Sequence, residues 1–224
     1  MVDLYKFDLD IPQEYKDALN DVRKEFPHAF LAGGALRDLV FNKPVKDLDI
    51  FAPQVKWIDD DLDWLVLKTD PTLENQGYKM LPKDVVLTKQ DSTDFAWKNI
   101  KGSDTYQKGD NIPVNVVVTD QSDTICRRLE LFDYGICQIA YDGNDVWVSD
   151  AFLHDKKESK FTYLISTPNM EQFEHNLSHF FRLKEKYPEF NLDIPPTTRW
   201  YEKNKTFKEE TDSEILDQIR EILK

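Results

Sequence analysis

The chain has 224 residues, 40% hydrophobic and 32% charged, a composition that predicts a folded protein with enough chain to bury a core. Its 29 Lys and Arg against 42 Asp and Glu give a formal net charge of −13 at pH 7, which argues against strong binding to duplex DNA. No apolar run approaches the roughly 20 residues of a membrane helix. The N-terminus is acidic, whereas a signal peptide is basic and then apolar, and two cysteines form no disulfide framework. We therefore expect a cytoplasmic protein without a membrane partner.

The first quarter of the chain predicts two helices and two strands. Apolar residues recur at helical spacing after Pro12, which indicates a helix over residues 12–26. The short apolar run 28–32 predicts a buried strand, and residues 35–41 after Gly33-Gly34 predict a short helix. Residues 45–52 alternate between apolar and acidic side chains, which predicts a second strand.

The rest of the chain predicts more strands, followed by helices. We expect a helix over 54–68, strands over 85–88 and 112–119, a loop over 89–111, and a helix to about 131 capped by Ser122 or Asp123. Strands over 136–141 and 146–149 flank a hairpin turn at 142–145, and helices are expected over 169–187 and 212–224, joined by a connector over 193–208. This is an α+β layout: a mixed sheet flanked by helices over 1–165, and a helical region over 166–224.

Residues 31–51 carry the chemistry. Two of the seven glycines, Gly33 and Gly34, are adjacent between a strand and a helix, where the backbone can approach a phosphate closely. Asp47 and Asp49 follow on the next predicted strand, and side chains two residues apart share one face of a strand. Paired carboxylates together with triphosphate oxygens are ligands that Mg²⁺ prefers. We therefore expect a divalent metal here, Mg²⁺ with Mn²⁺ as the alternative.

Each motif has an ordinary structural explanation when taken alone. An Asp-x-Asp sequence is usually a solvated strand face, and a Gly-Gly pair is usually a turn. The combination is a much more specific signal of a metal and phosphate site than either motif alone. It consists of a strand, Gly33-Gly34, a helix that contains Arg37-Asp38, and a strand that contains Asp47-x-Asp49.

Residues 33–51, GGALRDLVFNKPVKDLDIF, resemble the active-site signature of the polymerase-β nucleotidyltransferase superfamily. More narrowly, they resemble the class II poly(A) polymerases and CCA-adding enzymes. Residues 131–142 resemble that family's Arg-Arg-Asp-Phe-Thr-Ile-Asn-Ala-Leu-Ala-Tyr-Asp segment, in which the first Asp helps to recognise the nucleotide sugar. Residues 150–155 loosely resemble a third family segment, and the whole resemblance extends over about residues 15–187.

The resemblance implies a polymerase-β-type fold and transfer of a nucleoside monophosphate from an NTP to an acceptor hydroxyl, with release of pyrophosphate. The acceptor would be an RNA 3′ end, as in a tRNA, or else a protein or a small molecule. Asp47 and Asp49 would be catalytic and hold the metal. The implied nucleotide-binding residues are Gly33, Gly34, Arg37, Asp38 and Asp133; Arg37 would add charge or brace the loop, and Asp38 would be structural as easily as functional. Arg182 and Lys186, one turn apart on the predicted helix 169–187, are further candidates for binding a phosphate or a base, with surface solubility as the alternative explanation.

Four departures from the family pattern leave a second interpretation open. Asn115 stands where a third carboxylate is expected, and an amide cannot act as a general base, so Asp120, Asp133 or no residue takes that role. Leu131 and Phe132 replace both arginines of the family segment, the base-reading motif survives only as a remnant over 174–178, and residues 188–224 are too few for a tRNA-holding tail. The alternative is a catalytically inactive relative that binds nucleotide or protein.

His175 and His179 stand four residues apart on the predicted helix 169–187, which is the spacing of metal ligands. In the zincin pattern a glutamate follows the first histidine, whereas here Asn176 follows it. We therefore expect no zinc site at this pair.

Overall fold

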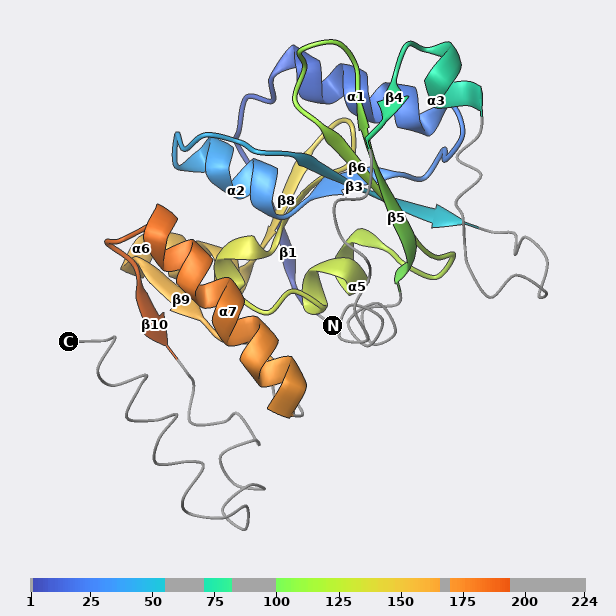
Figure 1. Ribbon diagram of the computed structural model, residues 1–224. Helices are drawn as coiled ribbons and strands as arrows, with labels where there is room; N and C mark the ends of the chain where they lie inside the picture. Colours follow the sequence, from blue (N-terminus) through green and yellow to red (C-terminus); the bar gives the residue numbers. More distant parts are fainter. Residues whose placement is uncertain (1, 55–70, 82–99, 166–169, 194–224) are drawn as a thin grey trace. The chain divides into compact units, whose positions relative to one another are not determined.

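The computed structural model of the protein describes residues 2–54, 71–81, 100–165 and 170–193, and within these ranges it is an α+β fold built on a large mixed sheet (Figure 1). The chain divides into two compact units. The first, unit 1, comprises residues 1–131 and 137–150, and the second, unit 2, comprises residues 132–136 and 151–224. The expected helices at 54–68 and 212–224, the strand at 85–88 and nearly all of the connector at 193–208 lie outside the described residues.

Unit 1 is organised by an eight-stranded sheet with the order β1-β8-β7-β2-β3-β6-β5-β4. Strands β3 and β6 run parallel, and every other neighbouring pair is antiparallel. The strands are β1 (Leu4–Phe7), β2 (Phe30–Ala32), β3 (Leu48–Gln54), β4 (Lys79–Met80), β5 (Ile100–Gln107), β6 (Val114–Asp120), β7 (Ile139–Tyr141) and β8 (Val146–Ser149). The central strands β2, β3, β6 and β7 therefore position the segments that the sequence singled out.

The predicted order of helix, strand, helix and strand in the first quarter of the chain is confirmed. It appears as α1 (Gln13–Arg23), β2, α2 (Gly34–Val40) and β3. The strand β3 begins at Leu48 and not at residue 45, because its register with β6 begins where Leu48 lies opposite Val114. The Leu48 N–H donates to the carbonyl of Pro113, just before β6, at 2.8 Å. Asp47 consequently lies just before the strand, while Asp49 lies within it.

The two faces of β3 have different partners because side chains alternate along a strand. Leu48 and Ile50 are fully buried on the face that α1 covers. Val114, which lies opposite Leu48 in the strand register, lines a pocket together with Ala18 of α1, which identifies that face. Asp49 and Phe51 point to the opposite face. There the helix α5 (Ile125–Glu130) places the guanidinium of Arg128 4.7 Å from the centre of the Phe51 ring.

The expected loop over 89–111 is wrong for residues 100–107 and right for residues 108–111, which form a turn. Residues 100–107 form β5, which pairs antiparallel with β6 along almost its whole length. The segment has a polar sequence, but it buries Asp104 and the ring of Tyr106. Cross-strand pairing with the apolar β6 therefore outweighs its low intrinsic preference for a strand.

The expected N-cap of α5 is also wrong. The cap is Thr124, whose hydroxyl accepts a hydrogen bond from the Arg127 N–H at 3.3 Å. Asp123 is instead buried, and its Oδ2 accepts hydrogen bonds from the Arg128 guanidinium at 2.9 Å and 2.5 Å. Burial lowers the pKa of Arg128, which the Asp123 carboxylate partly offsets. A buried charge is retained here because it is paired and hydrogen-bonded.

The predicted hairpin near residue 143 is confirmed as β7 and β8, with Gly143 at φ 94° in the turn. Strand β7 begins only at Ile139, because residues 135–137 form a 3₁₀ turn. Two further parts of unit 1 were not predicted: β1 at the edge of the sheet, and α3 (Pro71–Asn75) with β4.

Unit 2 contains α6 (Asp150–Glu158), α7 (Met170–Lys186) and a parallel pair of short strands, β9 (Lys160–Thr162) and β10 (Asn191–Asp193). Helix α7 confirms the predicted helix 169–187. The core of the unit is aromatic: the Phe161 ring contacts the rings of Phe180, Tyr187 and Phe190, with centroids 5.1–6.3 Å apart. Asp155 is buried beside this core, where its carboxylate accepts hydrogen bonds from the Ile136 N–H at 2.8 Å and the Thr162 N–H at 3.0 Å.

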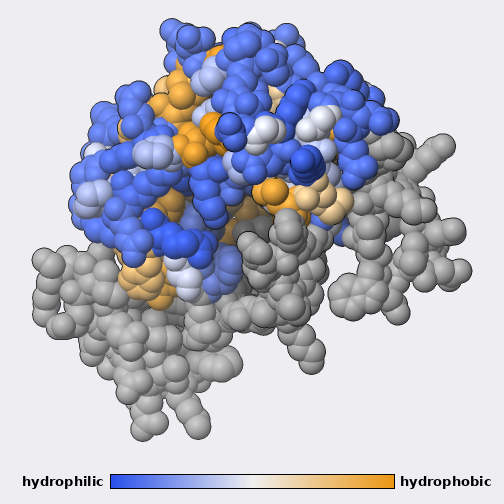
Figure 2. Space-filling view, turned by 45° about the horizontal axis from the view of Figure 1, so that its top comes forward, coloured by the Kyte–Doolittle hydropathy of each residue, from blue (hydrophilic) through white to orange (hydrophobic). Residues whose placement is uncertain are grey.

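The described surface is polar. The face brought forward in Figure 2 is largely hydrophilic, with separate small apolar areas. Among the described residues, Tyr5 and Met80 are the exposed large hydrophobic side chains, and none of the described helices has the length and apolar character needed to cross a membrane.

Candidate nucleotide and metal site

The turn between β2 and α2 depends on glycine. Gly33 has φ 81° and ψ −127°, a combination that side-chain-bearing residues rarely adopt. Its N–H donates to the Ile139 carbonyl at 2.9 Å, and its carbonyl accepts from the Arg37 N–H at 3.1 Å. Gly33 therefore fixes the direction of the turn, while Gly34 opens the helix, where backbone amides have no intrahelical acceptor.

Arg37 and Asp38 form a buried brace behind this turn. The Arg37 Nε and Nη2 atoms both donate to Oδ1 of Asp38, at 2.9 Å and 2.7 Å, and Nη1 lies 3.3 Å from the sulfur of Cys137 on the neighbouring segment. Both charged side chains are less than a tenth exposed. Asp38 thus has Arg37 as a buried partner, and Arg37 also contacts the segment that precedes β7.

Asp49 lies directly opposite Asn115 in the parallel pair of β3 and β6. The Asn115 side-chain amide donates a hydrogen bond of 2.9 Å to Oδ1 of Asp49. The position where the sequence led us to look for a third carboxylate is therefore adjacent to the predicted metal ligands, and it holds an amide in contact with one of them.

The Asp49 carboxyl group is costly to ionise in the metal-free protein. Desolvation, followed by the nearby charge of Asp47, raises its pKa to about 6, and the Asn115 hydrogen bond, Arg37 and Lys46 only partly offset this. Asp47 and Asp49 are two residues apart in the chain, at the start of β3. A divalent cation bound to both would remove the repulsion, and carboxylate oxygens are ligands that Mg²⁺ and Mn²⁺ prefer, so the donor set fits such an ion.

Two other acidic residues near these strands are placed away from Asp49. Asp120, one of the expected substitutes for a third carboxylate, pairs with Gln54 five residues further along β3, about 16 Å away along the strand. Its Oδ1 accepts hydrogen bonds from the N–H and hydroxyl of Ser122. Asp104 pairs with Val116 and so lies on the opposite face of the sheet. Within the described ranges, neither residue completes the Asp47–Asp49 pair.

The remaining predicted nucleotide-binding residues, Asp133, Arg182 and Lys186, belong to unit 2. Asp133 is buried, and its Oδ2 lies 2.7 Å from Nδ1 of His179, a side chain that is about a quarter exposed. The Tyr134 ring meets the imidazole edge-on at 5.7 Å. Arg182 is exposed, and Lys186 is half-buried. The sequence placed His175 and His179 together as a pair, but it gave no sign of the contact between His179 and Asp133.

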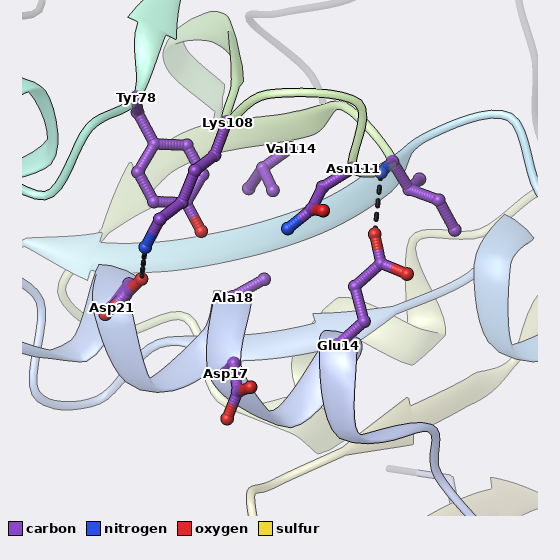
Figure 3. Close-up of a pocket in the computed structure, with 9 residues that line it drawn as sticks. Glu14, Asp17, Ala18, Asp21, Tyr78, Lys108, Asn111 and Val114 are labelled. Carbon is purple, nitrogen blue, oxygen red and sulfur yellow. Dashed lines mark hydrogen bonds and ion pairs between the residues drawn. The ribbon is translucent and has the colours of Figure 1, made fainter.

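A pocket of about 280 Å³ lies on the α1 side of the sheet (Figure 3), and Asp49 is not among its lining residues. Three of its lining residues are acidic and come from α1: Glu14, Asp17 and Asp21. Two of these carboxylates already have partners, because Glu14 accepts from the Ile112 N–H at 2.7 Å and Asp21 lies 3.3 Å from the Lys108 ammonium. An acidic lining repels a triphosphate, so this pocket is not the predicted nucleotide site.

Comparison with protein families gives one match. The model of the family described as "Gabija anti-defense 2 family protein" matches residues 12–158, more than half of the chain. No curated protein sequence matches the chain.

Solved structures with a similar fold include CCA-adding enzymes. The Thermotoga maritima CCA-adding enzyme complexed with tRNA is 14% identical with a TM-score of 0.55, covering 89% of this chain and 44% of the enzyme. The Bacillus stearothermophilus CCA-adding enzyme in complex with CTP is 16% identical with a TM-score of 0.52, covering 84% and 42%. A tRNA-processing enzyme in an apo form is 15% identical with a TM-score of 0.53, covering 87% and 47%. The chain thus spans less than half the length of each, and the likeness is one of fold: a nucleotidyltransferase-like fold.

Proposed function

The chain belongs to the Gabija anti-defense 2 family, and from that premise we propose that it acts against Gabija as a Mg²⁺-dependent nucleotidyltransferase of the class II kind, working in the cytoplasm. It transfers a nucleoside monophosphate from an NTP to an acceptor hydroxyl and releases pyrophosphate. The predicted domain of residues 1–165 carries the catalytic residues, and Asp47 and Asp49 hold the metal.

The observation that carries this proposal is the placement of Asp49, which lies two residues after Asp47 and directly opposite Asn115 in the parallel pair of β3 and β6. Desolvation and the charge of Asp47 raise the pKa of Asp49 to about 6. A fold gains nothing from such a pair in the absence of a cation, whereas a bound metal turns the repulsion into attraction. In the antiparallel pair of β2 and β3, Leu31 lies opposite Ile50, so Asp49 lies near the end of β2, where the glycine turn opens α2. Backbone amides at a helix start favour phosphate.

Each candidate site residue of unit 1 has a role that follows from its position. Asp47 and Asp49 bind the metal through their oxygens, and Gly34 lets the triphosphate approach the start of α2 without a side chain in the way. Gly33 fixes the turn through its φ of 81°, and Arg37, anchored on Asp38, holds the turn and adds positive charge near Asp49. Bound Mg²⁺ would supply neutralisation of the triphosphate and activation of the acceptor hydroxyl. Catalysis would rest mainly on positioning and charge.

The acceptor we favour is an RNA 3′ end, with a protein side chain or a small molecule as the alternatives. The solved structures with this fold include an enzyme complexed with tRNA and one in complex with CTP, which supports nucleotide and RNA as the partner classes to test first. In unit 2, Arg182 is exposed on α7 and is available to a phosphate or a base.

A second candidate function is binding without transfer, as a nucleotide- or protein-binding module. Asn115 favours it, because a neutral amide takes the place of a carboxylate beside Asp49 and accepts no proton at neutral pH. This candidate shares the metal site with the first but not the turnover.

Incubation of the full chain with each α-³²P-labelled NTP, Mg²⁺ and either pooled RNA or whole lysate tests the transfer. We expect label in RNA with at least one NTP, and none with Asp49→Asn. Asn144→Asp, at an exposed turn of the same unit, is the control for an Asn/Asp exchange away from the site. If calorimetry shows nucleotide binding but no labelled product forms, the protein is a binding module and not a transferase.

Co-expression with Gabija tests the link to anti-defence. The wild-type chain should abolish the defence, and Asp47→Ala/Asp49→Ala should restore it if catalysis is the means. A double variant that still abolishes the defence would show that binding is sufficient.

A further inference from the structure

The contact between Asn115 and Asp49 limits how many cations the site can hold. The two residues are direct register partners on parallel strands, and the amide donates to Oδ1 of Asp49 at 2.9 Å. The hydrogen bond uses the oxygen that points toward β6. A cation bridging Asp49 and position 115 would have to displace this donor, and position 115 offers a neutral side chain in return.

Neighbouring positions do not compensate for the missing charge. On the other side of Asn115, the register partner on β5 is Thr105, a neutral hydroxyl. Asp104 lies on the opposite face, and Asp120 is about 16 Å further along. Along β5, β6 and the start of β3, the charge offered to cations near Asp49 is therefore that of Asp47 and Asp49, which one divalent ion neutralises.

We propose that the site binds a single divalent cation together with its nucleotide, held by Asp47 and Asp49, and that the Asn115 amide occupies the place of a second cation. This inference rests on the proposed function, because it takes Asp47 and Asp49 to be metal ligands. It specifies that the nucleotide substrate binds together with one divalent cation and no second one. It also assigns Asn115 as a positioning residue that fixes Asp49 by a hydrogen bond, where a carboxylate would recruit a further ion.

The test counts Mn²⁺ ions bound to the full chain by electron paramagnetic resonance, in the presence of a saturating non-hydrolysable α,β-methylene ATP. After the Mn²⁺ bound by free nucleotide is subtracted, we expect one Mn²⁺ per chain in the wild type and two per chain in Asn115→Asp. The second ion in that variant should bind at least about tenfold more tightly than any second ion in the wild type, because affinity rises with ligand charge. Asn144→Asp adds the same charge at an exposed turn and should keep a count of one.

The possible results separate this inference from the proposed function. Two ions in the wild type would overturn the one-metal inference and leave the metal–nucleotide site standing. A count of one in Asn115→Asp, in a variant whose circular dichroism and unfolding midpoint match the wild type, would overturn the role of Asn115. No nucleotide-dependent Mn²⁺ in the wild type would contradict the proposed function itself.

Discussion

The Asn115 side-chain amide donates a 2.9 Å hydrogen bond to Oδ1 of Asp49 across the parallel strands β3 and β6. This contact bears on both interpretations of the protein, the transferase and the binding module. It places a neutral amide at the position where the sequence resemblance led us to expect a carboxylate. The predictions below separate the residues that bind ligand from those that only support the site.

The first prediction concerns pH. The pKa of Asp49 is about 6 in the folded protein and lies near its ordinary value of 3.8 when the chain unfolds, so the ionised group opposes folding. Its unfavourable contribution is fully present above pH 6 and disappears as the pH falls from 6 toward 4. Asp49→Asn should therefore be more stable than the wild type at pH 7.5, by up to about 2 kcal/mol, and the difference should vanish near pH 4.

Urea unfolding of both proteins at several pH values measures this. Added Mg²⁺ and nucleotide should stabilise the wild type and leave Asp49→Asn unchanged, because the ligand stabilises only a folded state that binds it. Equal stabilisation of both proteins would remove Asp49 from the metal site.

The second prediction separates the two glycines. A methyl group on Gly34 would lie 3.7 Å from Nη2 of Arg37, an ordinary contact, so Gly34→Ala should fold with a stability within about 1 kcal/mol of the wild type. Gly33 has a positive φ, so Gly33→Ala should lose about 2 kcal/mol. If the triphosphate approaches the start of α2, Gly34→Ala should weaken nucleotide binding at least about tenfold, equivalent to roughly 1.4 kcal/mol. Calorimetric titration with ATP checks this, and unchanged affinity would exclude Gly34 from the contact.

The third prediction concerns Arg37. Its guanidinium makes two hydrogen bonds to Asp38 in a buried setting, and a lysine ammonium cannot reproduce that fork. Arg37→Lys should therefore lose about 2–4 kcal/mol of stability, although it keeps the charge. Guanidinium unfolding gives the value. A variant of wild-type stability but reduced nucleotide affinity would mean that Arg37 contacts phosphate and is not a brace.

The fourth prediction concerns unit 2. The 2.7 Å contact between Nδ1 of His179 and Oδ2 of buried Asp133 should couple the two side chains by about 1–2 kcal/mol in a double-mutant cycle of Asp133→Asn and His179→Ala. The ¹⁵N chemical shifts of His179 should show the proton on Nδ1 in the wild type and a changed tautomer in Asp133→Asn. Arg182→Ala, at an exposed position of the same helix, should change stability by less than about 0.5 kcal/mol. Additive effects of the two variants would show that the contact contributes nothing.

Local pattern was sufficient to predict the elements around the candidate site. Helical spacing placed α1, and the Gly-Gly break separated β2 from α2, because each signal lies within a few residues. The polar segment of β5 was predicted as a loop, since its strand character comes from pairing with β6 and not from its own sequence.

Contacts between distant residues could not be predicted. Asp123 was predicted as a helix cap; its partner Arg128 is only five residues away, but the pair is buried by packing against distant residues such as Phe51. Asp133 and His179 are 46 residues apart, and only the fold of unit 2 brings them together. The sequence did single out Asn115, but whether it would contact Asp49 depended on the register of two strands more than sixty residues apart.

Pyrophosphate release tests the central claim most directly. The full chain is incubated with each of the four NTPs, Mg²⁺ and pooled cellular RNA, beside Asp47→Ala/Asp49→Ala. The account predicts release with at least one NTP, lost in the double variant. Release that persists in the double variant, or none with any NTP or acceptor, would contradict it.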